Sequence, residues 1–257
     1  EVESLRVLQG KVKKFPNLFL VLGTGWNHFA KEIHVEAEIG YKEWLGVDVN
    51  VPGHEGKLVI GKINNQWMAL MVGRLHLYEG YSAREATLPI RVLAQAGVKT
   101  MIVTSACGAL NPEYKVGDFV ILSDLLTLFL ALDNPLIGPQ FQDMSDVFDK
   151  SLKLKAKIVM QQEKIRYQEG VYAYYHGPNF ETPADKLALL RLGADVVGMS
   201  TVPEIIAARF AGINVLGLSF VTNLAFVKHD HLEVLDQAAK GSRQMRSLLV
   251  ELIGILA

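Results

Sequence analysis

Short apolar runs rich in β-branched residues recur along the chain of 257 residues, and each is bounded by glycine or by turn residues. Most of the runs are continuously apolar rather than alternating, which is typical of strands covered on both faces. These runs predict strands over 18–22, 58–63, 67–72, 100–104, 118–122, 170–175, 194–199 and 214–221.

Amphipathic stretches lie between several of these strands, and their starts carry helix-capping signals. Two pairs have the spacing of a capping box ahead of an apolar segment, namely Ser82 with Glu85 and Thr201 with Glu204. Thr182 precedes a proline suited to the first position of a helix, and this predicts a helix over 184–192. A last helix is predicted over 231–255.

The alternation of strands and helices predicts an α/β protein. No internal repeat, low-complexity segment or linker divides the chain. Apolar residues make up 50% of the sequence, which suffices for a substantial buried core. We therefore expect a single domain over residues 1–257, built on one sheet.

Charge and cysteine content narrow the class of function. The 26 basic and 27 acidic residues nearly cancel, so no broad basic surface indicates a nucleic-acid or membrane partner, and a small-molecule substrate is expected. The single cysteine, Cys107, excludes an intramolecular disulfide and is typical of a reducing compartment. No apolar run approaches the roughly 20 residues of a membrane span. These features predict a cytoplasmic protein.

Two segments that follow predicted strands offer groups that bind anions. Gly23, Thr24 and Gly25 form a turn in which backbone N–H groups and a hydroxyl can approach an anion. A purely structural turn is the alternative, because the third glycine of the dinucleotide fingerprint is absent. Arg74 and His76 have alternating spacing, so both can point the same way and donate to a phosphate oxygen. For them a solvated loop is the alternative.

Two further segments can be interpreted either as anion-binding or as purely structural. Ser200 lies between a strand and a helix start, where the positive end of the helix favours an anion, although it can also serve only as helix entry. The small residues around Ala106 leave backbone N–H groups reachable by a ligand, and tight packing is the alternative. A thiol nucleophile at Cys107 is disfavoured, since no base stands near it in the sequence.

Four residues suit recognition of a planar base that carries a lactam edge. A carboxylate accepts from N–H groups and an amide both donates and accepts, so Glu181 and Asn223 together can read a lactam edge. Phe180 can stack on the base, and Thr222 adjoins the amide. Taken singly, such residues are more often helix caps or surface groups. The hypothesis depends on their coming together.

A metal centre is not expected. The chain has seven histidines, including His229 and His231, but their spacing matches no common metal-site pattern.

Taken in order, these segments resemble the trimeric family of purine nucleoside phosphorylases, from about residue 18 to the C-terminal helix. The resemblance is carried by Val51-Pro52-Gly53-His54, Gly73-Arg74-Leu75-His76, Tyr78-Glu79-Gly80-Tyr81, Asn134-Pro135-Leu136, Met144-Ser145-Asp146, Gly177-Pro178-Asn179-Phe180-Glu181-Thr182 and residues 193–204. Two departures stand out: Ser105-Ala106-Cys107-Gly108-Ala109 replaces the family's common Asn-Ala-Ala-Gly-Gly, and Thr24 stands where many members have serine.

The resemblance implies a central mixed β-sheet, partly closed into a distorted barrel and flanked by helices, in a homotrimer. It implies reversible phosphorolysis of 6-oxopurine nucleosides such as inosine and guanosine, with inorganic phosphate as co-substrate and no cofactor. Phosphate would be held by Thr24, Arg74, His76, Ser200 and the backbone of Ala106, with His54 on the phosphate side. The base would be held by Phe180, Glu181, Thr222 and Asn223, and the ribose by Tyr78, Met199 and His231. Asn223, Glu181 and His76 are the expected catalytic residues.

Asn223 is also the basis of the expected substrate preference. Related phosphorylases that act on 6-aminopurine thioethers have an aspartate at this position, because an acceptor suits the exocyclic amine, whereas an asparagine favours an oxo group. Three alternatives stay open: a methylthioadenosine-type phosphorylase, a hydrolytic nucleosidase, and a nucleoside-binding protein without turnover. Phosphate dependence and base preference distinguish them.

Overall fold

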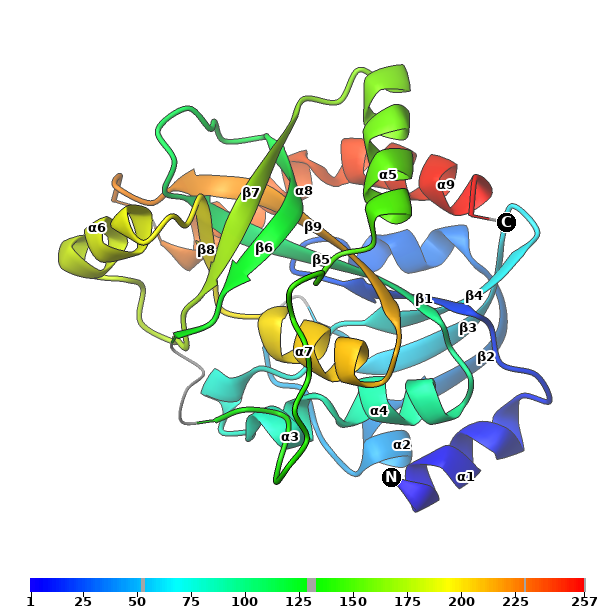
Figure 1. Ribbon diagram of the computed structural model, residues 1–257. Helices are drawn as coiled ribbons and strands as arrows, with labels where there is room; N and C mark the ends of the chain where they lie inside the picture. The colour runs from blue at the N-terminus through cyan, green and yellow to red at the C-terminus, as the bar shows by residue number, and fades with distance from the viewer. Residues whose placement is uncertain (52–53, 129–132, 229, 257) are drawn as a thin grey trace.

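The computed structural model describes residues 1–51, 54–128, 133–228 and 230–256, and these form one α/β domain (Figure 1). They contain a nine-stranded sheet in the order β2-β3-β4-β1-β5-β8-β7-β6-β9. The strands are β1 (Leu18–Leu22), β2 (His34–Gly40), β3 (Lys57–Ile63), β4 (Gln66–Val72), β5 (Thr100–Ala109), β6 (Phe119–Leu126), β7 (Tyr167–Tyr174), β8 (Val196–Gly198) and β9 (Asn214–Leu224). The helices are α1 (Val2–Lys11), α2 (Tyr41–Leu45), α3 (Ala83–Ala86), α4 (Leu88–Gln95), α5 (Lys150–Gln162), α6 (Pro183–Arg191), α7 (Val202–Phe210), α8 (His231–Lys240) and α9 (Ser242–Gly254), with 3₁₀ turns η1 (Asn27–Glu32) and η2 (Leu77–Glu79).

Part of the sheet closes on itself. Strand β9 pairs with β6 at the end of the order and also with β5, so β5, β8, β7, β6 and β9 form a closed barrel. The pairing is mixed: β5 runs parallel to β9 and antiparallel to β8. The expected mixed sheet, partly closed into a barrel, is therefore confirmed.

The continuously apolar strands are buried on both faces. In β1, Phe19 and Val21 pack into one core, whereas Leu20 and Leu22 pack into another on the opposite face, as the two-residue period of a strand requires. Figure 1 shows α5 and α9 along one side of the sheet and α4 and α7 along the other. This double covering explains why alternation was absent from the sequence of β1.

All eight predicted strands are present, but β5 extends well beyond its predicted range, and a ninth strand, β2, was not predicted. Strand β5 continues through Ala109 instead of ending at residue 104, so the small-residue segment is strand rather than loop. Strand β2 was missed because its residues are mostly exposed and include Glu36 and Glu38, so it has no apolar run. It lies at the free edge of the sheet order, where polar side chains are expected.

The four helix predictions have different outcomes. The caps at Ser82 and Thr182 are confirmed, each accepting from the backbone N–H three residues on at 3.2 Å. The helix start at Thr201 is confirmed, since α7 begins at Val202, but the capping box is only half formed. The Glu204 carboxylate accepts from the backbone N–H of Thr201, whereas the Thr201 side chain makes no capping bond and its φ of 74° is outside the extended region of an N-cap. The last helix is divided at Gly241, where a Cβ would lie 2.3 Å from the ring of Phe220.

Within the described ranges, no helix has both the length and the apolar character needed to cross a membrane.

Candidate active site

A cavity of about 380 Å³ opens where several strands end. Every site residue predicted from the sequence lines it except His54, which lies directly behind the wall. The lining comes from the turn after β1, two residues of the segment ahead of β3, the segment after β4 and the second half of β5. The loop between β7 and α6, the end of β8 with the residues after it, the end of β9 and the start of α8 complete it. The carboxyl ends of strands are the usual place for ligand sites in α/β sheets.

One wall of the cavity is an unpaired stretch of backbone. On that edge of β5, pairing with β1 ends at Val103 and pairing with β8 begins at Gly108. Residues 104–107 lie between, so their outward backbone groups have no strand partner on this edge. The cavity occupies this opening and is lined by Ala106. A backbone contact from Ala106 to a ligand is therefore possible even though the segment is a strand.

The glycine-rich turn is needed for packing. The N–H of Gly23 donates to Thr104 Oγ1 at 2.9 Å, so it is not available to an anion. A Cβ at Gly23 would lie 2.6 Å from the carbonyl oxygen of Thr104, and one at Gly25 would lie 2.6 Å from the Cβ of Ala238. Both glycines are therefore explained by close packing of the turn. Thr24, which has the only side-chain hydroxyl among residues 23–25, lines the cavity.

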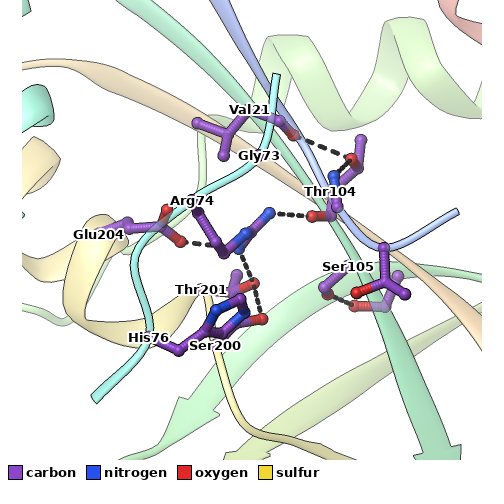
Figure 2. A network of polar contacts seen from close by, with 12 residues as sticks. Val21, Gly73, Arg74, His76, Thr104, Ser105, Ser200, Thr201 and Glu204 are labelled. Carbon is purple, nitrogen blue, oxygen red and sulfur yellow. Dashed lines mark hydrogen bonds and ion pairs between the residues drawn. The ribbon is translucent and has the colours of Figure 1, made fainter. Parts of the chain in front are cut away.

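Arg74 is a buried cation with fixed partners (Figure 2). Only 1% of its surface is exposed. Its Nη1 donates to Thr201 Oγ1 at 2.9 Å and to Glu204 Oε2 at 2.8 Å, and its Nη2 donates to the carbonyl oxygen of Thr104. Burial raises the pKa of Glu204, and attraction to Arg74 opposes that rise. The Nε of Arg74 is buried and has no hydrogen-bond partner within the described structure, so this N–H group can still donate to a ligand.

His54 connects Arg74 to Thr24. Its Nδ1 accepts from the backbone N–H of Arg74 at 3.2 Å, which assigns the ring proton to Nε2. Nε2 lies 3.4 Å from Thr24 Oγ1 and can donate to it, leaving the Thr24 hydroxyl hydrogen free for a ligand. Burial lowers the pKa of His54 to about 2, with the nearby His76 and Arg74 adding to the effect, so this ring stays neutral.

His76 is buried against Glu79 and Tyr78. Its Nδ1 lies 3.2 Å from Glu79 Oε2, and its ring stacks on that of Tyr78 at 4.6 Å between centroids. Burial lowers the pKa of His76, although Glu79 acts in the opposite direction. A neutral ring that donates from Nδ1 has a lone pair on Nε2. That atom can accept the hydrogen of hydrogen phosphate, and it donates to phosphate only when the ring is protonated.

The groups expected to read a base also lie together. Thr222 is buried and its Oγ1 lies 3.0 Å from Asn223 Oδ1 and 3.2 Å from the carbonyl oxygen of Cys107. A Cβ at Gly108 would lie 2.9 Å from Asn223 Nδ2, so the glycine makes room for the amide. Glu181 is 7% exposed and Phe180 is 37% exposed, which places the carboxylate deep and the aromatic ring nearer the opening.

The ribose candidates flank the same space. Gly177 has a φ of 71°, and a Cβ there would lie 2.5 Å from Met199 Sδ and 3.3 Å from Tyr78 Cδ1. The loop that carries Phe180 thus packs directly onto Tyr78 and Met199. His231 is the first residue of α8 and is exposed, while His229 lies outside the described residues, as do Pro52 and Gly53 of the motif before His54.

The comparisons with known proteins agree with this arrangement. Residues 19–254 match the family described as the Phosphorylase superfamily. Purine nucleoside phosphorylase of Bos taurus is 37% identical over 98% of this chain and 94% of its own length, and purine nucleoside phosphorylase 1 of Geobacillus stearothermophilus is 40% identical over 87% and 84%. The chain belongs to the purine nucleoside phosphorylase family.

Solved structures of this family share its fold. A Schistosoma purine nucleoside phosphorylase in complex with hypoxanthine has a TM-score of 0.91 and 33% identity, with 100% of this chain and 96% of that chain covered. The Schistosoma mansoni enzyme in complex with inosine has a TM-score of 0.91 and 34% identity over the same shares of the two chains.

Several residues that line the cavity or contact its lining were not predicted as site residues. Glu79 is three residues after His76, and that spacing at the end of a strand was the signal for their contact. Glu204 and Thr201 were assigned to a helix cap, because their spacing is compatible with both roles. Cys107 lines the cavity, but burial raises the pKa of its thiol well above the usual range, which is the opposite of an activated nucleophile. In the described part of the chain, no three His, Cys, Asp or Glu residues are grouped so as to hold a metal ion.

Proposed function

We propose that this chain catalyses the phosphorolysis of purine nucleosides, with a preference for 6-oxopurines. The observation that carries the proposal is one cavity lined both by Arg74, His76 and Ser200 and by the pair Glu181 and Asn223. The first group suits a phosphate and the second suits a lactam edge. The solved relatives in complex with inosine and with hypoxanthine support this choice of substrate and product.

Cleavage of the glycosidic bond separates charge. As the bond from C1′ to N9 breaks, its electron pair goes to the purine and cationic character develops on the ribose. A phosphate held beside Arg74 offsets that cation and then forms the new bond to C1′. The products are free purine, which takes up a proton, and ribose 1-phosphate. No protein nucleophile is required.

The base-reading groups act where negative charge develops. Asn223 can donate to O6 and, once the departing purine takes up its proton at N7, accept from N7–H, while the Glu181 carboxylate accepts from N1–H. Hydrogen bonds that strengthen as the purine gains charge lower the barrier rather than only improving binding. A relative has also been solved in complex with adenosine, so the preference for an oxo group is tested by comparing inosine with adenosine as substrates.

The identity of the sugar product tests the proposed reaction. With inosine and phosphate, ³¹P NMR should show a ribose 1-phosphate resonance that grows in step with released hypoxanthine. Free ribose without any phosphorylated product would indicate a hydrolytic nucleosidase, and tight inosine binding without release of base would indicate a binding protein.

We also propose that the enzyme is a homotrimer of the cytoplasm that requires no cofactor. Support for self-association comes from exposed apolar side chains near one another in the chain, with Ile137 at 57% and Phe141 at 93% exposure.

Phosphorolysis needs only nucleoside and phosphate, so full activity after exhaustive dialysis against EDTA is expected. A loss of activity that a metal ion restores would contradict the absence of a cofactor.

A further inference from the structure

The turn between β8 and α7 is strained. Thr201 has φ 74° and ψ −46°, and the carbonyl oxygen of Ser200 accepts from the N–H of Val202 at 2.7 Å. This is a γ-turn with positive φ, a rare conformation that is especially unfavourable for a β-branched residue. Such strain persists only where surrounding contacts hold it, and an observed outlier of this kind is grounds for asking what it serves.

Arg74 contacts this turn through its guanidinium group (Figure 2). One nitrogen, Nη1, donates both to Thr201 Oγ1 and to Glu204 Oε2, and all three residues are at most 4% exposed. Thr201 Oγ1 also lies 3.1 Å from Ser200 Oγ. A single hydroxyl therefore joins the two side chains that are expected to contact phosphate, Arg74 and Ser200.

These contacts also fix the orientation of the guanidinium. Glu204 and Thr201 take the hydrogens of Nη1, and the carbonyl oxygen of Thr104 takes one hydrogen of Nη2. Of the five N–H bonds, those left without an acceptor in the described structure are on Nε and Nη2. A carboxylate alone could bind the guanidinium through either edge, whereas acceptors on three residues allow one arrangement.

We propose that Thr201 and Glu204 are positioning residues for phosphate. They do not touch it. They set Arg74 and Ser200 at the distance and angle at which both can bind one anion, and the strained turn is kept because it places the Ser200 hydroxyl beside that anion. This inference rests on the proposed phosphorolysis, and it gives the Thr201 and Glu204 pair a role in addition to the helix start that its spacing predicts.

Two variants of Thr201 test the inference. Thr201→Val keeps the branched shape and removes the acceptor for Arg74, so the KM for phosphate should rise on the order of 10- to 100-fold, as for other small misplacements of positioning groups. The KM for inosine should change far less. Thr201→Ser keeps the hydroxyl and should restore the phosphate KM to within about threefold of the original. Equal phosphate KM values for the two variants would overturn the inference.

Variants of Glu204 separate orientation from charge. Glu204→Gln keeps an oxygen that can accept from Nη1, and Glu204→Leu removes it. Positioning predicts a much larger rise of the phosphate KM for the leucine variant, whereas equal rises would contradict it. Asp118→Asn is the matched control, because Asp118 is a buried carboxylate paired with Arg166 at 2.7 Å and does not line the cavity. It should lower the Tm and leave the phosphate KM unchanged.

Phosphate binding can be followed without turnover. Inorganic phosphate should raise the Tm of the wild type, and Thr201→Val should lose most of that shift while Thr201→Ser keeps it. If the wild type binds phosphate but releases no base, the proposed function fails and the positioning role is still decided by these shifts. If the wild type is active and Thr201→Val keeps both its phosphate KM and its shift, the positioning role alone is wrong.

Discussion

Asn223 is the residue on which base preference depends, and its amide is held by neighbours on β5 and β9. Thr222 Oγ1 contacts its Oδ1 at 3.0 Å, and Gly108 leaves space for its Nδ2. An amide fixed in this way presents one pattern of donor and acceptor to a ligand. A buried site rejects a substrate that leaves such groups unpaired.

Asn223→Asp should lower kcat/KM for inosine on the order of 100-fold, because a carboxylate cannot donate to O6. The ratio of adenosine to inosine should rise, since an acceptor suits the exocyclic amine. Steady-state kinetics with both nucleosides measure this. An unchanged ratio would remove Asn223 from base recognition. Asn214→Asp, at the exposed opposite end of β9, is the control and should leave the ratio as it was.

The two buried histidines predict how stability depends on pH. Burial lowers the pKa of both His54 and His76 in the folded state. The unfolded chain, with its ordinary histidine pKa near 6.5, therefore binds more protons than the folded chain below that pH. Stability should be constant above about pH 7 and should fall as the pH drops through about 6.5, with each histidine steepening the loss by up to about 1.4 kcal/mol per pH unit.

Urea unfolding at pH 7.5, 6.5 and 5.5 measures this dependence. In His54→Asn, which cannot take up the proton, the fall between pH 6.5 and 5.5 should be shallower than in the wild type. A variant of the exposed His34 is the control. Parallel curves for wild type and His54→Asn would show that His54 takes up its proton equally in the folded and unfolded chains.

At the scale of elements, the division of the last helix illustrates what one glycine does. A Cβ at Gly241 would lie 2.3 Å from the Phe220 ring, so Gly241→Ala should cost about 1–3 kcal/mol of unfolding free energy through overpacking. Gly10→Ala is the matched control: it lies in α1 with nothing within 4 Å of its added Cβ, and it should stabilise by about 0.5–1 kcal/mol. Equal effects measured by chemical denaturation would contradict the packing account.

Sequence patterns predicted an element correctly where only one structural feature could produce the pattern. Strand β1 was found because burial on both faces leaves a continuous apolar run. Strand β2 was missed because an exposed edge needs no such run. The spacing of Thr201 and Glu204 has two possible causes, a cap or a shared contact with a distant residue. The helix does start here, and only the placement of Arg74, 127 positions away from Thr201, reveals the shared contact as well.

At the scale of the whole molecule, local patterns could not predict that the sheet closes. The pairing of β9 with β5 joins Thr100 to Asn214 and so depends on contacts far apart in the sequence. The barrel was expected only through family resemblance. The candidate site was predicted better, since its residues follow strand ends along the chain and the sheet brings strand ends together.

Self-association is a prediction at this scale too. Light scattering should give three times the chain mass of 28.4 kDa. Phe141→Asp places a charge on a side chain that is 93% exposed in the single chain, and it should shift the mass toward smaller species if that surface is an interface. Asp143→Asn, close by in the sequence and exposed, is the control. A wild-type mass equal to that of one chain would contradict the trimer.

The most direct test of the central claim is release of free base from inosine, guanosine, adenosine and methylthioadenosine, each with and without inorganic phosphate. One cavity lined both by Arg74 and Ser200 and by Glu181 and Asn223 predicts rapid release from inosine and guanosine only when phosphate is present. Release that is independent of phosphate, or that is fastest from the two aminopurine nucleosides, would contradict it.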